Sequence, residues 1–324
     1  MRALYFSVDD DGVGPGRELL EAAGWDITEA RCATADELVE HGQGADALLG
    51  SYVPVTRAVL QSLPAVAIVA TDSVGFENVD LDAARELGVW VANVPGAATD
   101  EVAEHALAMS LALIRQLPFY DRSVRAGAWG PLPGPPRKME TLTVAVIGLG
   151  RIGRRYAELA QPIAGRVVGA DPMLPADAWP EGVERCEVDD AFAAADLVSL
   201  HLPLDAATRH LAGERMFGLM RPGGYVVNVS RGGLVDPDAL LAALGCGRLA
   251  GAALDVFDPE PPDPASPLLH HPRVLATPHV AYLSDASTAA YLRGQAENVL
   301  AWQRTGRPLT PVAEPVPGTE RRKL

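Results

Sequence analysis

Residues 143–153 read TVAVIGLGRIG, in which a run of β-branched residues meets three glycines. The run predicts a buried strand, and the residues after the glycines predict a helix. Gly148 permits a tight turn, Gly150 lets other atoms approach the backbone closely, and Gly153 allows the helix to lie close to the strand. A strand that passes through such a turn into a helix is the opening unit of a doubly wound parallel sheet.

The same alternation of strand and helix continues in both directions from this turn. In the second half of the chain, strands are expected at residues 144–147, 166–170, 197–200, 225–228, 250–254 and 274–277. In the first half, strands are expected at residues 3–7, 45–49, 66–70 and 89–92, with helices at 17–23, 56–62 and 81–87. We therefore predict an α/β protein with two successive doubly wound, Rossmann- or flavodoxin-like parallel sheets.

Three further segments connect or follow these sheets. The apolar stretch at residues 99–117 predicts a helix, capped by Thr99 or Asp100, that is buried between domains or in a subunit contact. Residues 127–136 contain four prolines and predict a connecting loop. Residues 287–304 predict a helix that returns to the first sheet, and residues 308–324 predict a loose tail.

Length and composition limit the function classes. The 324 residues, 48% hydrophobic and 21% charged, suffice for about two domains with substantial cores. With 42 acidic and 27 basic residues the net charge is −15, which argues against binding to nucleic acid or an anionic membrane. The N-terminal apolar run is too short for a signal peptide, and Cys32, Cys186 and Cys246 form no paired motif. We expect a cytoplasmic protein that binds a small molecule or another protein.

Metal binding is not indicated. The acidic run at residues 9–11 suggests a cation loop, but it lacks the full calcium-loop pattern and is better explained as a solvated turn. His210, His270 and His271 lack the spacing of a zinc-binding helix.

The glycine turn is followed by an acidic residue in the position that a nucleotide site requires. Asp171 comes 18 residues after Gly153, at the end of the next expected strand, where its carboxylate can accept hydrogen bonds from adenosine ribose hydroxyls. Its charge would repel a 2′-phosphate, and residues 172–174 offer no Arg or Lys to bind one. The pattern favours NAD over NADP; the alternative is a tight glycine turn with a surface aspartate.

Three polar residues follow later strands, at the edge where open α/β sheets build their sites. They are Arg231, Glu260 and His279. An Arg can bind a substrate carboxylate and polarise a carbonyl, a His can donate a proton, and a carboxylate can raise the pKa of that His. This set suits carbonyl reduction by a nicotinamide. Taken singly, each also fits a solvated or backbone-bonded loop residue.

Together these motifs resemble the D-isomer-specific 2-hydroxyacid dehydrogenase family. The resemblance extends over nearly the whole chain, through motifs in the family's order at residues 94–96, 99–106, 148–153, 201–204 with Thr208, 220–224, 228–236, 253–257, 260–261 and 277–279. It implies that Arg231, Glu260 and His279 are catalytic. It also implies a homodimer, a substrate domain at residues 1–98 and 283–324, an NAD-binding domain at 99–282, and an interdomain cleft.

The resemblance further implies individual contacts. The expected cofactor-binding residues are Gly148, Leu149, Gly150, Arg151, Ile152, Gly153, Asp171, His201, Pro203, Thr208, Val229, Ser230, Arg231, Asp255 and His279, with Asp255 near the nicotinamide carboxamide. The expected substrate-binding residues are Ser73, Val74, Gly75, Arg231, His279 and Tyr282. Tyr282 follows from residues 280–284, which look closest to the D-lactate dehydrogenase and C-terminal-binding-protein branches; an aromatic at a helix start is as often mere packing.

One stretch departs from the family pattern. Where the family usually has a glycine pair, often with an arginine two residues ahead of it, residues 71–75 read TDSVG. Thr71 stands at the arginine position, and Ser73 replaces the first glycine. Backbone N–H groups at Ser73, Val74 and Gly75 can still hold a carboxylate, but Asp72 adds a negative charge nearby.

We therefore expect an NAD-dependent oxidoreductase that interconverts a small 2-oxo acid and its D-2-hydroxy acid. The first alternative is an NAD(H)-sensing protein-interaction module, against which the intact catalytic positions argue. A second alternative is oxidation of a small anion such as formate or phosphite, for which the altered loop leaves room.

Overall fold

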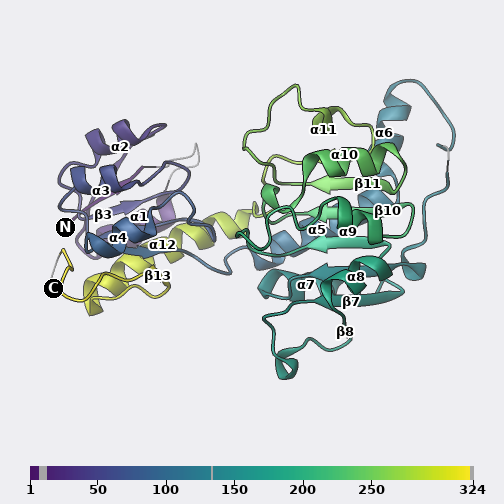
Figure 1. The fold of residues 1–324 in the computed structure, drawn as a ribbon. Helices are drawn as coiled ribbons and strands as arrows, with labels where there is room; N and C mark the ends of the chain where they lie inside the picture. The colour runs from purple at the N-terminus through teal and green to yellow at the C-terminus, as the bar shows by residue number, and fades with distance from the viewer. Residues whose placement is uncertain (7–12, 133, 322–324) are drawn as a thin grey trace. The chain divides into compact units, whose positions relative to one another are not determined.

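In the computed structural model the chain forms two compact units (Figure 1). Unit 1 comprises Met1–Ala97 and Ser284–Leu324, and unit 2 comprises Ala98–Leu283. The structure describes residues 1–6, 13–132 and 134–321, so the acidic run at residues 9–11 lies outside the described part. Within that part, each helix is too short or too polar to cross a membrane.

Unit 1 contains a six-stranded sheet in the order β13-β5-β4-β3-β1-β2. Five strands are parallel, and β13 is antiparallel to β5. Its elements are β1 Arg2–Tyr5, α1 Gly14–Ala22, β2 Asp26–Glu29, α2 Ala35–His41, β3 Ala47–Leu49, α3 Arg57–Ser62, β4 Ile68–Ala70, α4 Leu81–Glu86, β5 Trp90–Ala92, α12 Asp285–Thr305 and β13 Pro311–Ala313.

Helices cover both faces of this sheet, as expected for a doubly wound fold. Apolar residues of α2, α3 and α4 pack on one face around Leu4 and Phe6. Those of α1 and α12 pack on the other face around Tyr5 and Ile68. Side chains that alternate along β1 therefore enter two separate cores, which is why its residues are apolar at successive positions.

Unit 2 contains a seven-stranded parallel sheet in the order β12-β11-β10-β9-β6-β7-β8. Its elements are α5 Thr99–Ile114, α6 Leu117–Arg125, η1 Met139–Thr141, β6 Thr143–Ile147, α7 Arg151–Ala160, β7 Arg166–Ala170, η2 Ala176–Ala178, β8 Glu184–Arg185, α8 Val188–Ala194, β9 Leu197–Leu200, α9 Glu214–Leu219, β10 Gly224–Asn228, η3 Gly232–Leu234, α10 Pro237–Gly245, β11 Leu249–Leu254, α11 Pro267–His270 and β12 Val274–Ala276. The predicted fold class, with two doubly wound parallel sheets, is confirmed.

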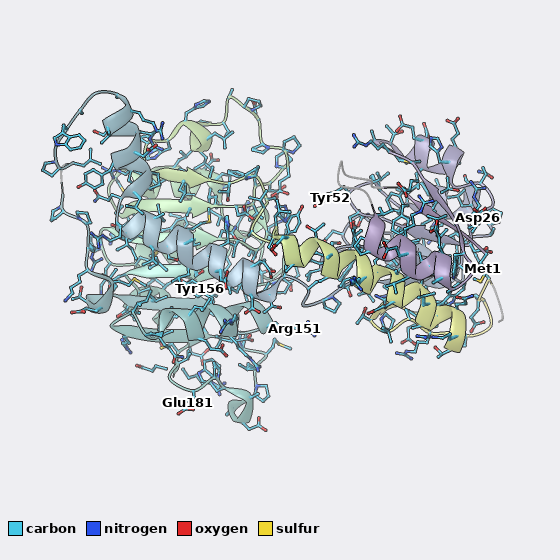
Figure 2. All side chains as sticks on the ribbon, turned by 180° about the vertical axis from the view of Figure 1, so that it is seen from behind. Met1, Asp26, Tyr52, Arg151, Tyr156 and Glu181 are labelled. Carbon is cyan, nitrogen blue, oxygen red and sulfur yellow. The ribbon has the colours of Figure 1, made fainter. Side chains whose placement is uncertain are left out.

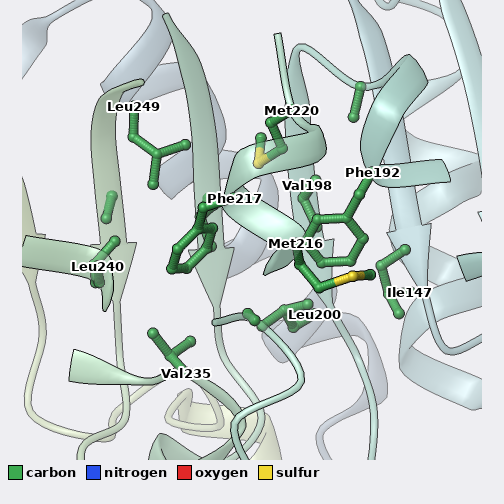
Figure 3. Close-up of a cluster of buried hydrophobic side chains, with 14 of the residues drawn as sticks. Ile147, Phe192, Val198, Leu200, Met216, Phe217, Met220, Val235, Leu240 and Leu249 are labelled. Carbon is green, nitrogen blue, oxygen red and sulfur yellow. The ribbon is translucent and has the colours of Figure 1, made fainter. Parts of the chain in front are cut away.

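The core on one face of this sheet is built from α8, α9 and α10. Phe192, Met216 and Phe217 interdigitate above Val198 and Leu200 of β9 (Figure 3). All five side chains are at most 2% exposed. This apolar layer holds β9, β10 and β11 in register, so that their carboxyl ends reach one edge together.

The apolar helix α5 covers the other face of the same sheet. It packs against α7, β10 and β11, and Ser110 joins Tyr156 of α7 through a buried 2.9 Å hydrogen bond. These contacts within unit 2 account for the apolar character of α5. The sequence alone predicts that this helix is buried between domains or in a subunit contact. Its N-cap residue is Ala98, so the predicted cap at Thr99 or Asp100 is wrong.

The C-terminal segment differs from the predicted loose tail. Strand β13 pairs with β5, and Arg321 reaches back to the sheet's helices. The Arg321 guanidinium donates hydrogen bonds of 2.7 to 3.1 Å to the backbone carbonyls of Leu60, Leu63, Val66 and Leu87. Carbonyls at helix ends lack partners within the helix, so one planar cation can satisfy several of them.

We predict that Arg321→Ala lowers the free energy of unfolding by about 2 kcal/mol, because several buried carbonyls lose a charged donor. Urea denaturation followed by circular dichroism measures the change. Arg304→Ala on the exposed side of α12 serves as the matched control, with an expected change within about 0.5 kcal/mol. Equal stabilities of the two variants would contradict the anchoring role of Arg321.

Candidate active site

The three catalytic candidates of unit 2 follow strands that are neighbours in the sheet. Arg231 comes after β10, Glu260 after β11 and His279 after β12. Because the strands are parallel, their carboxyl ends lie along one edge, and the residues that follow are brought to that edge.

His279 and Glu260 form a close pair. Nδ1 of His279 lies 2.6 Å from Oε2 of Glu260, and Oε1 of Glu260 accepts a 2.8 Å hydrogen bond from the backbone N–H of Phe257. Both carboxylate oxygens are thus engaged, which fixes the carboxylate plane. Both side chains are about one-third exposed, so the pair stays open to a ligand.

The pKa values of the pair are displaced in opposite directions. The hydrogen bond with Glu260, and then the negative charges of Glu260 and Asp255, raise the pKa of His279 against the lowering effects of desolvation and Arg231. Burial pushes the pKa of Glu260 upward, but hydrogen bonds from His279 and Phe257 and the nearby positive charges outweigh it and lower that pKa. Both shifts favour an imidazolium paired with a carboxylate.

The backbone around His279 is held by Asp255. This carboxylate is fully buried, and it accepts hydrogen bonds from the Thr277 hydroxyl at 2.5 Å and from the N–H groups of Val280 and Ala281 at 3.0 and 2.9 Å. The N–H of His279 donates to the Asp255 carbonyl at 2.7 Å. His279 adopts a left-handed backbone with φ of 54°, a conformation that costs a non-glycine residue energy and therefore needs this support.

The Asp255 carboxylate supports the fold of the Thr277–Ala281 turn. The expected contact of Asp255 with a nicotinamide carboxamide stays a prediction. The residue acts on the site through His279.

The loop that carries Arg231 is shaped by a buried asparagine. Nδ2 of Asn228 donates to the carbonyl of Arg231 at 2.8 Å, and its Oδ1 accepts from the N–H of Ser230 at 3.1 Å. Gly232 touches the Phe257 backbone so closely that an added Cβ would stand 2.0 Å from its carbonyl carbon. The loops after β10 and β11 are thereby joined, and the Arg231 charge influences the pKa values of both Glu260 and His279.

The glycine turn has the geometry of a phosphate-binding turn. Gly148 has φ of 91°, and an added Cβ there would collide with the His201 carbonyl at 2.4 Å. At Gly150, the N-cap of α7, an added Cβ would have no atom within 4 Å apart from those of the adjoining chain. At Gly153 it would stand 2.0 Å from the Gly148 carbonyl oxygen. The turn is closed on its inner side and open above the helix N-terminus, which fits a dinucleotide pyrophosphate.

Asp171 lies directly beside this turn. Its Oδ2 accepts from the N–H of Leu149 at 2.8 Å, and its Oδ1 accepts from the N–H of Met173 at 2.9 Å. Each carboxylate oxygen has lone-pair capacity left for a ribose hydroxyl. The residue is therefore placed where the sequence pattern predicts it.

The other residues expected to bind the cofactor differ in how exposed they are. Thr208 closes this loop by donating to the Pro203 carbonyl at 2.8 Å. Pro203 is exposed, and Ser230 joins the loop by donating to the Leu200 carbonyl at 2.8 Å. At the start of α7, Arg151 is exposed and Ile152 is half-buried. Val229 is only 8% exposed and Leu149 is fully buried, so the side chains of these two residues face the protein interior.

His201 lies beside Tyr156 and Ser199, and its expected contact with the cofactor stays a prediction. Its Nε2 lies 2.8 Å from the Ser199 hydroxyl, and its ring lies 5.0 Å from that of Tyr156, centroid to centroid. Burial lowers the pKa of His201 to about 3, so the ring is neutral, and Nδ1 is buried with no partner among the described residues. The backbone and the Cβ of His201 lie close to the glycine turn, because an added Cβ would stand 2.4 Å from the His201 carbonyl oxygen at Gly148 and 3.2 Å from the His201 Cβ at Gly153.

Sequence reasoning missed two other residues of this region. His105 of α5 places Nε2 3.1 Å from the Thr277 hydroxyl, which itself donates to Asp255. Tyr156 of α7 links α5 to His201. For His105, the available signal was a polar residue inside the otherwise apolar helix α5. Tyr282 lies with its ring centroid 6.5 Å from that of His279, edge to face, at a distance that suits a pocket wall.

The expected substrate loop belongs to unit 1. It follows β4, and its three carbonyls point toward the protein: Val94 N–H donates to Ser73 O at 2.9 Å, Asn93 Nδ2 to Val74 O at 2.7 Å, and Ser73 Oγ to Gly75 O at 2.6 Å. The N–H groups of Ser73, Val74 and Gly75 have no acceptor among the described residues. They are available to an anion, as predicted from the sequence.

Comparison with known proteins defines the class. The sequence profile described as "D-isomer specific 2-hydroxyacid dehydrogenase, NAD binding domain" matches residues 107–281, which lie within unit 2. The chain belongs to the D-isomer-specific 2-hydroxyacid dehydrogenase family, and NAD(H) is the cofactor of the matched domain. Residues 148–153 and Asp171 are the groups that would hold it.

Individual relatives carry different names. A glyoxylate reductase of Korarchaeum cryptofilum is 35% identical over 82% of this chain and 82% of its own length. A D-3-phosphoglycerate dehydrogenase of Methanocaldococcus jannaschii is 36% identical over 87% of this chain. The structure of Escherichia coli D-lactate dehydrogenase matches 97% of this chain and 100% of its own with a TM-score of 0.86 and 28% identity. The chain spans 36% to 56% of the length of several phosphoglycerate dehydrogenases that it matches.

We predict that Glu260→Gln lowers the pKa of His279, because the amide removes the hydrogen-bonded negative charge that stabilises the imidazolium. The His279 ring protons, followed by NMR across a pH series, measure this shift without any need for activity. Glu181→Gln, an exposed residue before β8, is the matched control and leaves the titration unchanged. An unchanged titration in Glu260→Gln would show that the pair does not couple in solution.

Proposed function

We propose that this protein is an NAD-dependent oxidoreductase that interconverts a small 2-oxo acid and its D-2-hydroxy acid. The observation that carries the proposal is the 2.6 Å pairing of His279 Nδ1 with Glu260. It orients the imidazole and leaves Nε2 without a partner among the described residues, in the protonated state that a carbonyl reduction needs.

The roles of the residues follow from their chemistry. When bound, NADH supplies a hydride to the carbonyl carbon of the substrate. His279 donates a proton from Nε2 to the carbonyl oxygen, so that the carbonyl becomes a secondary alcohol, and Glu260 stabilises the imidazolium before the transfer. Arg231 binds the substrate carboxylate and polarises the carbonyl through its planar pair of donors. In the oxidation direction, neutral His279 accepts the proton.

The units have separate assignments in this proposal. Unit 2 binds NAD(H) and supplies the proton donor. Unit 1 is the substrate domain, and its N–H groups at Ser73, Val74 and Gly75 bind an anionic group of the substrate. Tyr282 shapes the substrate pocket. An intact proton donor has no use in a pure NAD(H) sensor, which favours the enzymatic function over the sensing alternative.

The decisive test is a screen of 2-oxo acids in which NADH or NADPH consumption is followed by absorbance. We expect turnover with NADH, and His279→Gln is expected to lower kcat by roughly 100-fold or more while the Kd for NADH stays the same. His41→Gln at the exposed end of α2 is the control. If NADH binds but no 2-oxo acid is reduced, or if His279→Gln retains full activity, the proposal is wrong.

We further propose a homodimer formed through the α6 segment, residues 117–132. All nine residues of α6 are at least partly exposed, and Leu117, Val124 and Trp129 are 57%, 49% and 91% exposed. The segment lies at one edge of unit 2 (Figure 1). Such an apolar surface is costly in water unless a partner covers it, and a second copy of the chain is the occupant that the family resemblance implies.

Light scattering after size exclusion measures the mass of the assembly. The unmodified protein is expected at twice the mass of the chain, and Leu117→Glu with Trp129→Glu at the mass of one chain, because two charges would have to be buried. Leu309→Glu, an exposed residue of unit 1, should remain dimeric. A monomeric unmodified protein would rule out this assembly.

A further inference from the structure

The buried Asp255 carboxylate has a further neighbour outside the turn after β12, the imidazole of His105. His105 lies in α5, which packs against β10 and β11, and its side chain is 25% exposed. Its Nε2 lies 3.1 Å from Thr277 Oγ1 and 3.7 Å from Asp255 Oδ1. All three residues belong to unit 2, so their arrangement depends on one compact unit alone. The imidazole connects α5 with the carboxyl ends of β11 and β12.

The contacts of the Thr277 hydroxyl decide which group is the donor. This hydroxyl donates to Asp255 Oδ1 at 2.5 Å, a length typical of a hydroxyl bonded to a carboxylate. A hydroxyl has one proton, and a carboxylate has none to donate. Because the Thr277 proton is committed to Asp255, His105 Nε2 must carry the hydrogen of the 3.1 Å contact. The imidazole therefore has its proton on Nε2 and donates it to Thr277 Oγ1.

The hydrogen bonds run in one direction, from His105 to Thr277 to Asp255. Bonds in such a chain strengthen one another, because a hydroxyl that accepts a hydrogen bond becomes a better donor. Without the imidazole, the Thr277 hydroxyl would lose the group that holds its oxygen in place. Asp255 Oδ1 also accepts from the N–H of Val280 at 3.0 Å, so a displaced carboxylate would disturb the backbone beside His279.

The geometry after β12 shows why a small displacement matters. His279 has φ of 54°, and its Nδ1 lies 2.6 Å from Glu260. A left-handed backbone persists at a non-glycine residue only where the surrounding contacts over-determine it. The N–H groups of Thr277 and His279 both donate to carbonyls at the end of β11, at 3.0 and 2.7 Å. The direction of the His279 side chain therefore depends on where Thr277 is held.

We propose that His105 is a positioning residue: its Nε2–H fixes the hydroxyl of Thr277 and, through it, the turn that carries His279. This inference rests on the proposed function, in which His279 is the proton donor, and adds a residue that acts through others. His105 supplies a fixed hydrogen-bond donor from α5, a helix that its buried apolar residues anchor to the sheet.

The first test uses the unmodified protein. Long-range proton–nitrogen correlation NMR spectra at alkaline pH report which ring nitrogen of His105 carries the proton. We expect the proton on Nε2. A proton on Nδ1 alone would leave Nε2 without a hydrogen for Thr277 and would overturn the inference.

The second test removes the donor and restores it. His105→Leu keeps an apolar side chain in an apolar helix, so α5 stays packed while Thr277 loses its donor. We expect the pKa of His279, followed by NMR, to fall because its pairing with Glu260 loosens. kcat is expected to fall about fivefold to tenfold, as for the loss of one hydrogen bond. His105→Gln places an amide N–H at the same number of bonds from Cα and should restore both properties.

Two comparisons separate positioning from other effects of the substitution. If His105 acted only as a charge, its removal would raise the pKa of His279, because a nearby cation disfavours an imidazolium. A rise, or no change, therefore rules out the positioning role. In Thr277→Val the shared hydroxyl is absent, so His105→Leu should alter the His279 titration no further. Additive shifts in the double variant would show that His105 does not act through Thr277.

The matched control concerns another polar contact of α5. Ser110 lies 2.9 Å from the hydroxyl of Tyr156 in α7, which packs beside α5 (Figure 2). Tyr156→Phe removes this buried contact, and Ser110 keeps its hydrogen bond to the Ala106 carbonyl. The titration of His279 should stay unchanged. A fall as large as that in His105→Leu would show that any polar loss in α5 has this effect, which contradicts a specific role.

These outcomes are distinguishable from those of the proposed function. The proton position on His105 and the titration of His279 are measured without turnover, so the failure of every 2-oxo acid counts against the oxidoreductase alone. Turnover of a 2-oxo acid, combined with an unchanged His279 titration in His105→Leu, counts against the positioning role alone.

Discussion

The buried carboxylate of Asp255 is the interaction on which the catalytic geometry depends. It fixes three groups of the turn after β12 at once, and this turn places His279 in a left-handed conformation that a histidine would not adopt alone. A fully buried carboxylate is costly unless its hydrogen bonds are satisfied, so the turn cannot relax without leaving Asp255 buried and without donors. The strain at His279 is thereby maintained, and its imidazole faces Glu260.

The parallel sheet explains why few contacts suffice to bring the three catalytic candidates to one edge. Arg231, Glu260 and His279 each follow a different strand, but the three strands are neighbours, and the apolar layer of α8, α9 and α10 keeps them aligned. Short links such as Asn228 to Arg231 then orient the loops locally. The same logic applies to unit 1, where Ser51 and Asp72 meet because β3 and β4 are paired.

Sequence patterns predict these strand ends well because apolar β-branched runs and glycine turns are local signals. They do not predict what depends on distant partners. Strand β2 reads DITE and is half-exposed at an edge, so it lacks the apolar signature of a buried strand. The anchoring of Arg321 needs carbonyls more than 230 residues away, and the position of the His201 ring depends on Tyr156 and Ser199. The Asp255 carboxylate likewise reveals its structural role only through three donors in another loop.

In the proposed function, the two units also divide the chemistry by charge. Unit 2 supplies the cations, Arg231 and protonated His279, which any 2-oxo acid requires because each has a carboxylate and a carbonyl. Unit 1 supplies the uncharged N–H groups of Ser73, Val74 and Gly75, which do not take part in hydride or proton transfer. On this proposal, a change in the loop at residues 71–75 alters the substrate that binds while the reaction is retained. Such a separation is a physical reason why members of one family carry the names of different substrates.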